Sequence, residues 1–308
     1  MQGKVVTVFG GSGFIGRYVV RALLARGARV RIAEREPSEG WFLKTQGGLG
    51  QTQFVTADIR NPGSVARALA GADAVVNLVG ILKGDFQAFH VDGARHVAEA
   101  AALQGCTALV HISAIGADAN SASAYGRSKA EGEAAVRAAF PAATILRPSI
   151  VFGREDNFVN KFASMISMLP VVPVIGSSVK LQPVFVGDVA NAIVAALDEA
   201  QAGKTYEIGG PQVPSMLTLN QWIARAIGRD PSFLPVSDAF AALLAAVTGW
   251  VPGAPITSDQ VRMLKSDNVV TGENGLKALG VAPTPIEAVA HDWLVRYRRN
   301  GRFAEAKA

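Results

Sequence analysis

The sequence lacks several features of secreted, metal-binding and membrane-spanning proteins. It has one cysteine, Cys106, which excludes a disulfide framework and argues against a cysteine-based zinc site, so we predict no metal. No run of about 18 apolar residues occurs, and we expect no membrane-spanning helix. The first predicted strand begins by Lys4, so we expect no signal or transit peptide in this sequence. A reducing compartment is consistent with this composition.

Charge and length narrow the class further. The net charge of +5 favours an anionic cofactor, an anionic membrane surface or an acidic partner. The basic residues are scattered without an aromatic platform or recognition motif, so we predict no nucleic-acid binding. With 308 residues, 49% of them hydrophobic, the chain can form one large α/β domain, or a nucleotide domain with a smaller appendage.

Strands and helices are predicted to alternate along the first half of the chain. Short β-branched runs indicate strands at 4–9, 29–33, 53–57, 74–79, 108–113 and 143–146, and helical patterns lie at 14–26, 62–69, 91–103, 128–139 and 189–199. Because parallel strands need crossover helices, this order predicts an α/β fold with a doubly wound parallel Rossmann sheet.

The regular alternation of strand and helix patterns ends after Arg147, where prolines become frequent and indicate loops. We predict a dinucleotide-binding Rossmann domain over residues 1–155, rejoined by residues 180–208. Residues 156–179 and 209–308 are predicted to form a smaller, partly discontinuous C-terminal lobe for substrate or partner binding.

A glycine-rich loop follows the first strand and opens the first helix, as a dinucleotide-binding motif requires. It consists of Gly10, Gly11, Ser12, Gly13, Phe14, Ile15 and Gly16. Gly10 permits the tight turn, Gly13 lets phosphate approach the backbone, and Gly16 allows close packing of helix on strand. The helix N-terminus then offers N–H groups and a positive dipole to a diphosphate. The spacing resembles the extended branch of the short-chain dehydrogenase/reductase superfamily.

The end of the second strand should contact the adenosine ribose. A carboxylate at Glu34 would select NAD(H), whereas a guanidinium at Arg35 would pair with a 2′-phosphate and select NADP(H). Arg35 stands where NADP-dependent members of the superfamily carry arginine, so the resemblance favours NADP(H), with NAD(H) as the alternative.

Three further segments resemble cofactor-contacting segments of that superfamily. Asp58 and Ile59 resemble the pair that meets the adenine, although Asp58 has the alternative role of a turn or capping residue. Asn77, Val79 and Gly80 resemble the segment along which the cofactor passes, with a structural role as the alternative. Pro148 resembles the proline near the carboxamide and suits a rigid wall.

Tyr125 and Lys129 are four residues apart, which places both on one helix face. In the superfamily the tyrosine is the general acid/base, and the lysine lowers its pKa and binds the nicotinamide ribose. The third member of that site is a serine or threonine past the fifth strand. Here Ser113 either fills that role or is the structural serine before it, which would leave Ala114 or Ile115 at the catalytic position.

Several longer motifs resemble the nucleotide-binding accessory subunit of respiratory complex I (NADH:ubiquinone oxidoreductase) and its bacterial relatives. The motifs lie at 77–80, 125–133, 157–163, 182–189 and 259–268, and the last is the most specific. The resemblance implies a bound, largely structural NADPH and a position on the peripheral arm of complex I. For this chain it implies a cytoplasmic protein, peripheral on the cytoplasmic face of the inner membrane.

Three functions stay open at this stage. The first is an accessory or assembly subunit associated with complex I. The second is an active NADP(H)-dependent reductase, epimerase or dehydratase that uses Tyr125 and Lys129, and the third is a redox-sensing regulator. The apolar stretch 239–251 contains Trp250. We predict that it is a core helix of the C-terminal lobe or, alternatively, a segment that contacts a membrane surface or a partner, with Trp250 as an interfacial anchor. The basic tail at Arg296, Arg298, Arg299 and Arg302 is predicted to be a solvated helix end or a lipid-headgroup contact.

Overall fold

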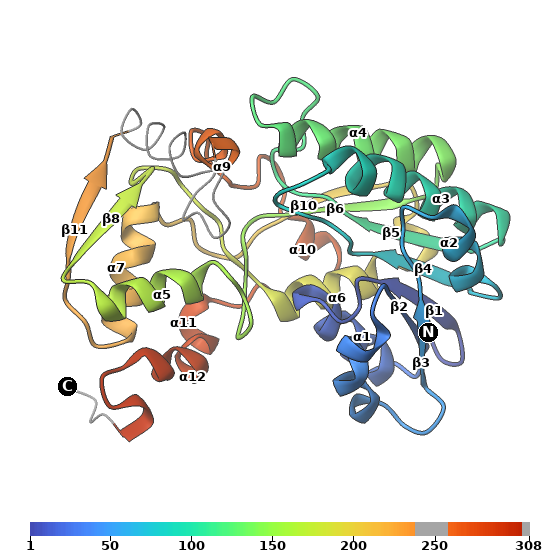
Figure 1. Cartoon of the computed structure of the whole chain (residues 1–308), viewed down its shortest axis with the longest axis horizontal. Coiled ribbons are helices and arrows are strands. Elements are labelled where there is room, and N and C mark those ends of the chain that lie inside the picture. Colours follow the sequence, from blue (N-terminus) through green and yellow to red (C-terminus); the bar gives the residue numbers. More distant parts are fainter. Residues whose placement is uncertain (238–257, 304–308) are drawn as a thin grey trace. The chain divides into compact units, whose positions relative to one another are not determined.

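The computed structural model describes residues 1–237 and 258–303, which cluster into two compact units (Figure 1). Unit 1 comprises Met1–Pro148, Val186–Ile208 and Gly272–Ala282, and unit 2 comprises Ser149–Phe185, Gly209–Thr271 and Pro283–Ala308. The segment Gly272–Ala282, which the sequence analysis assigned to the C-terminal lobe, clusters with unit 1. The apolar stretch 239–251 lies outside the described residues.

Unit 1 is built on a sheet of seven parallel strands in the order β10-β6-β5-β4-β1-β2-β3. The strands are β1 (Val5–Phe9), β2 (Arg29–Glu34), β3 (Thr52–Thr56), β4 (Ala74–Asn77), β5 (Ala108–Ile112), β6 (Thr144–Pro148) and β10 (Thr205–Ile208). The chain runs outward from β1 to β3 and then crosses to β4 on the other side of β1. This reversal creates a switch point at the carboxyl ends of β1 and β4, where such sheets bind ligands. The predicted doubly wound parallel sheet is confirmed.

Helices cover both faces of this sheet (Figure 1). On one face lie α1 (Phe14–Ala25) and α6 (Val186–Ala195), and on the other lie α2 (Pro62–Leu69), α3 (Gly93–Leu103) and α4 (Ala124–Ala139). Shorter elements are the 3-10 helices η1 (Pro37–Gln46) and η3 (Glu199–Gln201), the π-helix η2 (Gln87–Asp92), and α10 (Gly275–Ala278). The inner strands β1, β4 and β5 are mostly apolar and buried, as a sheet with two helical layers requires, whereas the edge strands β3 and β10 are mostly half-buried or exposed.

Unit 2 has its own apolar core. Its longer helices, α5 (Val159–Met168) and α7 (Met216–Ala226), bury one side of β8. Its strands form two small parallel sheets, β7 (Val151–Phe152) with β9 (Val184–Phe185), and β8 (Val171–Ile175) with β11 (Ser232–Val236). The remaining described elements are α9 (Ser258–Met263), α11 (Ile286–Val289), α12 (His291–Leu294), η4 (Val295–Tyr297) and η5 (Gly301–Phe303).

Asn268 joins parts of unit 2 that are far apart in the sequence. Its side-chain oxygen accepts hydrogen bonds from Ser149 Oγ at 2.7 Å and from the Ile150 amide at 3.1 Å. Its carbonyl oxygen accepts from the Gln182 amide at 3.1 Å. Asn268 closes the most specific motif of the sequence, 259–268, so the last position of that motif has a structural reason: it holds the chain after β6 against the segment before β9.

Two residues of the predicted basic tail make hydrogen bonds inside unit 2. The Arg296 guanidinium donates to Asn160 Oδ1 at 2.7 Å, and Arg298 donates to the Ala226 carbonyl at 3.2 Å at the end of α7. These two arginines therefore take part in packing the C-terminal segment. Within the described residues, no helix is both long and apolar enough to cross a bilayer.

Gly132 provides a test of the packing of α4. A Cβ there would lie 2.1 Å from the His90 carbonyl oxygen of η2. We therefore expect Gly132→Ala to destabilise the protein by about 2 kcal/mol through overpacking, although alanine ordinarily stabilises a helix interior. Gly63 in α2 is the matched control, because its added Cβ would meet no atom closer than 3.4 Å. Gly63→Ala should leave stability unchanged or raise it by up to about 1 kcal/mol. Urea unfolding with equal midpoints for the two variants would contradict this packing.

Candidate functional site

The glycine loop lies at the switch point and opens α1. Gly10 has a φ of +78°, a conformation that favours glycine, and it turns the chain at the end of β1. A Cβ at Gly16 would lie 2.2 Å from the Gly10 carbonyl oxygen, so α1 can pack against the loop only because residue 16 has no side chain. Gly13 is exposed, and a Cβ there would approach only that same carbonyl, at 3.2 Å.

The start of α1 fits an anion. Among the described residues no side chain caps its first turn, and that turn contains no acidic residue. The first N–H groups and the positive end of the helix dipole therefore have, within the described chain, no side-chain cap and no acidic residue of that turn to compete with a bound anion. This is the arrangement that binds a diphosphate. Phe14 and Ile15, at the first two helical positions, are half-buried. The residues present thus fit the dinucleotide that the sequence predicted.

Glu34, at the end of β2, is bound to the glycine loop. Its Oε1 accepts a hydrogen bond from the Ser12 amide at 2.6 Å, and burial raises the pKa of this carboxyl. Arg35, the next residue, is exposed. The loop amide therefore occupies the Glu34 carboxylate, while the exposed Arg35 follows directly after the carboxyl end of β2.

Asp58 forms an ion pair across the turn after β3. Arg60 donates to it through Nε at 3.0 Å and through its own backbone amide at 2.9 Å. These hydrogen bonds, and to a smaller extent the charge of Arg35, lower the pKa of the Asp58 carboxyl. Asp58 is thus a turn residue, which was one of its two predicted roles, and its carboxyl is close enough to Arg35 to respond to that charge.

Most of the chain's excess positive charge is located in one segment. Residues 17–50 contain seven arginines and lysines against three glutamates, an excess of four in a chain whose total excess is five. Within this segment Arg17 donates to the Ser12 carbonyl at 3.4 Å, and its guanidinium lies over the Phe42 ring at 5.0 Å. Arg17 and Arg35 of this segment lie near the glycine loop and the end of β2, whereas Arg26 and Arg29 lie at the opposite end of α1 and at the start of β2.

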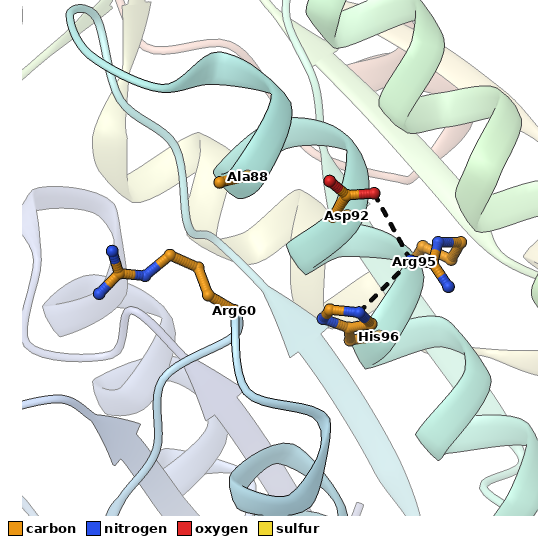
Figure 2. A pocket seen from close by; sticks show the side chains of 5 residues that line it. All are labelled: Arg60, Ala88, Asp92, Arg95 and His96. Atoms are coloured by element: carbon orange, nitrogen blue, oxygen red, sulfur yellow. Dashed lines mark hydrogen bonds and ion pairs between the residues drawn. The ribbon is translucent and has the colours of Figure 1, made fainter.

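Ile59 is buried, and its carbonyl accepts a hydrogen bond from His96 Nδ1 at 2.9 Å. Behind this turn lies an open pocket of about 330 Å³, lined by Arg60, Ala88, Asp92, Arg95 and His96 (Figure 2). Its charged groups pair with one another or with Asp58 and Glu99. With its charges already paired, this pocket gives no argument for a separate ligand site.

Asn77 organises the chain that leaves β4. Its side-chain oxygen accepts from the Val79 amide at 3.1 Å, and its amide nitrogen lies 3.3 Å from His111 Nδ1 in the core. A Cβ at Gly80 would lie 3.9 Å from Lys129 Nζ. The structure therefore brings the segment after β4 next to the lysine of α4, and Asn77 acts on it through hydrogen bonds.

Tyr125 and Lys129 both lie on α4, which begins four residues earlier than predicted because Ser123 caps it by accepting from the Gly126 amide. Lys129 is buried, and its Nζ donates to the Ile112 carbonyl at 2.8 Å. Burial lowers the pKa of Lys129 to about 8 and raises the pKa of Tyr125 to about 12. The direction for Tyr125 is opposite to the one that acid/base chemistry at neutral pH needs.

Ser113 and Pro148 lie at the ends of neighbouring strands. The Ser113 amide donates to the Leu146 carbonyl at 2.8 Å, whereas its Oγ is buried without a hydrogen-bond partner among the described residues. Pro148 is buried at the end of β6 and accepts from the Ile115 amide at 3.1 Å. Both residues lie at the carboxyl edge of the sheet.

Sequence reasoning missed three residues around Tyr125. His90, Phe86 and Ser128 form ring contacts or hydrogen bonds beside it. Ser128 belonged to the recognised motif but had no assigned role. His90 carried no signal of its own, because nothing in its local pattern separates a buried histidine from a surface helical one.

The chain matches known families along most of its length. Residues 6–209 match the NAD dependent epimerase/dehydratase family. The chain is 36% identical to mouse (Mus musculus) NADH dehydrogenase (ubiquinone) 1 alpha subcomplex subunit 9, mitochondrial, over 307 residues, which cover 97% of this chain and 81% of the mouse protein. It is 32% identical to the Neurospora crassa mitochondrial NADH-ubiquinone oxidoreductase 40 kDa subunit over 310 residues, which cover 98% of this chain and 82% of that subunit. The chain belongs to the family of these subunits, within the epimerase/dehydratase family. The predicted resemblance is confirmed.

A solved structure shares the fold. The Citrobacter sp. triphenylmethane reductase complexed with NADP(H) superposes with a TM-score of 0.77 at 20% identity, covering 94% of this chain and 99% of the reductase chain. At this identity the likeness concerns the fold alone. The match to the NAD dependent epimerase/dehydratase family is what supports a nicotinamide dinucleotide as the class of cofactor for this chain.

The raised pKa of Tyr125 predicts a pH effect on stability. Because burial disfavours the phenolate, the folded pKa of about 12 lies above the ordinary value of 10.0, and the folded state holds this proton more tightly. The contribution is complete below pH 10 and should be lost as the pH rises from 10 toward 12, by about 1.4 kcal/mol per pH unit. Tyr125→Phe should lack this loss, as measured by urea unfolding between pH 9 and 11. Parallel curves for both proteins would contradict the burial of the phenol.

Proposed function

We propose that this chain is an accessory or assembly subunit of respiratory complex I that holds one NADP(H) as a bound, largely structural cofactor. It associates with the peripheral arm, on the cytoplasmic face of the inner membrane. The observation that carries the proposal is the identity with complex I subunits over nearly the whole chain, including unit 2. The relatives are named as mitochondrial subunits. For this chain we propose the cytoplasmic face of the inner membrane instead.

The choice of NADP(H) is supported by the end of β2. The Glu34 carboxylate is already bound to the Ser12 amide, which leaves it less able to accept from a ribose 2′-hydroxyl. Arg35 is exposed beside it, in the segment that holds most of the chain's excess positive charge. A guanidinium at that place pairs with a 2′-phosphate.

A structural role for the cofactor is supported by the residues of the catalytic pattern. Tyr125 has a raised pKa, and the Lys129 ammonium donates to a backbone carbonyl. The residues after Ser113 are Ala114 and Ile115, whose side chains cannot donate a hydrogen bond to a substrate carbonyl. These features favour retention of the nucleotide over turnover.

Arg35→Ala tests the nucleotide preference. Loss of a charge-assisted hydrogen bond to the 2′-phosphate should weaken NADPH binding about 10- to 100-fold and leave NADH binding unchanged. Isothermal titration with both nucleotides measures this. In the control Glu34→Gln, the side-chain oxygen can still accept from Ser12, so NADPH affinity should be equal or higher. An equal loss of both nucleotides in Arg35→Ala would argue against a 2′-phosphate contact.

Association with complex I is tested in native membranes. A tagged chain, solubilised in mild detergent, should co-migrate with NADH:ubiquinone oxidoreductase activity on native gels and release NADP(H) on denaturation. Tyr125→Phe should assemble equally well and retain its nucleotide, because the proposal gives the phenol no chemical step. A chain that migrates alone, or that carries no nucleotide, would contradict the proposal.

A second candidate is an active NADP(H)-dependent reductase, epimerase or dehydratase. It is favoured by the Ser113 hydroxyl, which is buried without a protein partner in the described part of the chain and could be satisfied by a ligand. This function requires rapid exchange of NADP(H) and a turnover that Tyr125→Phe abolishes. The same purified proteins therefore separate the two candidates.

A further inference from the structure

His90 is a buried polar residue at the centre of the site, and both of its ring nitrogens make hydrogen bonds. It lies in the π-helix η2 and is 2% exposed. Its Nε2 accepts from the Ile81 amide at 3.0 Å. Its Nδ1 therefore carries the proton and donates to Ser128 Oγ at 2.9 Å. The Ser128 hydroxyl in turn donates to the Tyr125 carbonyl at 2.8 Å.

The imidazole of His90 is uncharged, which suits a ring that donates one hydrogen bond and accepts another. Burial, and next the charge of Lys129, lower the pKa of His90 to about 4. Neutral imidazole has one donor and one acceptor, and here each has one protein partner. The ring thus connects the segment that leaves β4 with the first turn of α4, and it does so in one tautomer.

The aromatic surroundings hold the same ring in place. Phe86 stacks on His90 at 5.2 Å between centroids, with an interplanar angle of 14°. The Tyr125 ring lies nearly perpendicular to both rings in T-shaped contacts, with its centroid 5.5 Å from that of His90 and 6.0 Å from that of Phe86. The orientation of the Tyr125 ring therefore depends on His90 through packing, in addition to the hydrogen bonds through Ser128.

The backbone of His90 is also held against α4. The absence of a side chain at Gly132 lets the His90 carbonyl approach α4 closely, since a Cβ there would lie 2.1 Å away. A Cβ at Gly80 would lie 3.7 Å from His90 Nε2 and 3.9 Å from Lys129 Nζ. The wide π-turn at this point thus places one ring between the segment after β4 and the residues of α4.

We propose that His90 is the positioning residue for the nicotinamide half of the bound cofactor. The adenosine half would lie toward β2 and β3, where Arg35 and Asp58 are found. The other half must then lie on the β4 side of the switch point, where His90 connects Ile81 to Tyr125. His90 acts through these neighbours, and the proposal rests on the proposed binding of NADP(H).

The experiment compares two ligands in one variant. NADPH spans both halves of the site, whereas 2′,5′-ADP carries only the adenosine half with its 2′-phosphate. In His90→Ala, NADPH affinity should fall about tenfold or more, as expected for lost hydrogen bonds, while 2′,5′-ADP affinity stays unchanged. The fluorescence emission of bound NADPH should shift toward that of the free nucleotide. Equal losses for the two ligands, or NADPH affinity equal to wild type, would overturn the proposal.

Conservative variants give the matched controls. The amide oxygen of His90→Gln can accept from the Ile81 amide, and the amide nitrogen of His90→Asn can donate to Ser128. Each should restore part of the NADPH affinity, and Ser128→Ala should lower it by less than His90→Ala. If His90→Ala does not fold, this order is read from the other three variants, and no difference among them and wild type would overturn the proposal. Wild-type protein that binds neither ligand would instead overturn the proposed NADP(H) site itself.

Discussion

The contact between Gly16 and the Gly10 carbonyl determines where α1 begins and where its N–H groups point. Any side chain at residue 16 would overlap that carbonyl, so the helix start and the loop form one rigid unit. The same device recurs on the other face of the sheet. Gly93 of α3 lies against Ile59, and Gly132 of α4 lies against the His90 carbonyl. Each helix that lines the site is thus placed by a glycine in close contact with its neighbour.

The motif from Tyr125 to Glu133 owes much of its pattern to packing. Gly126 packs against Ser121, Ser128 binds His90, and Glu133 forms a bidentate ion pair with Arg147 at 2.8 and 2.7 Å. These positions would be needed for folding even if no substrate were ever converted. A chain of this family can therefore keep the appearance of an enzyme for structural reasons, and the presence of the tyrosine and lysine does not by itself establish chemistry.

The sequence was informative where periodicity and glycine spacing carry the signal. The six predicted strands lie within two residues of the observed ones at each end, because buried β-branched runs between glycines have few alternatives. Strand β10 was missed, since Thr205–Ile208 is only partly apolar and follows the last clear helix. The π-helix η2 was also missed, because one extra residue in a helical turn leaves no distinct pattern. The bond from Glu34 to Ser12 depends on a contact between distant residues, which a single sequence does not reveal.

The discontinuous make-up of the two units has a consequence for biosynthesis. Unit 1 needs Gly272–Ala282 in addition to its first 148 residues, and the Asn268 clamp of unit 2 spans 119 positions from Ser149. Neither unit can close while the ribosome is still translating the middle of the gene product. Strands β1 to β6 can pair with one another once the first 148 residues have emerged, but α6, β10 and α10, which complete unit 1, follow much later. The nascent polypeptide therefore holds an incompletely covered sheet until nearly the whole chain has emerged, a state that is prone to aggregation and favours chaperone assistance.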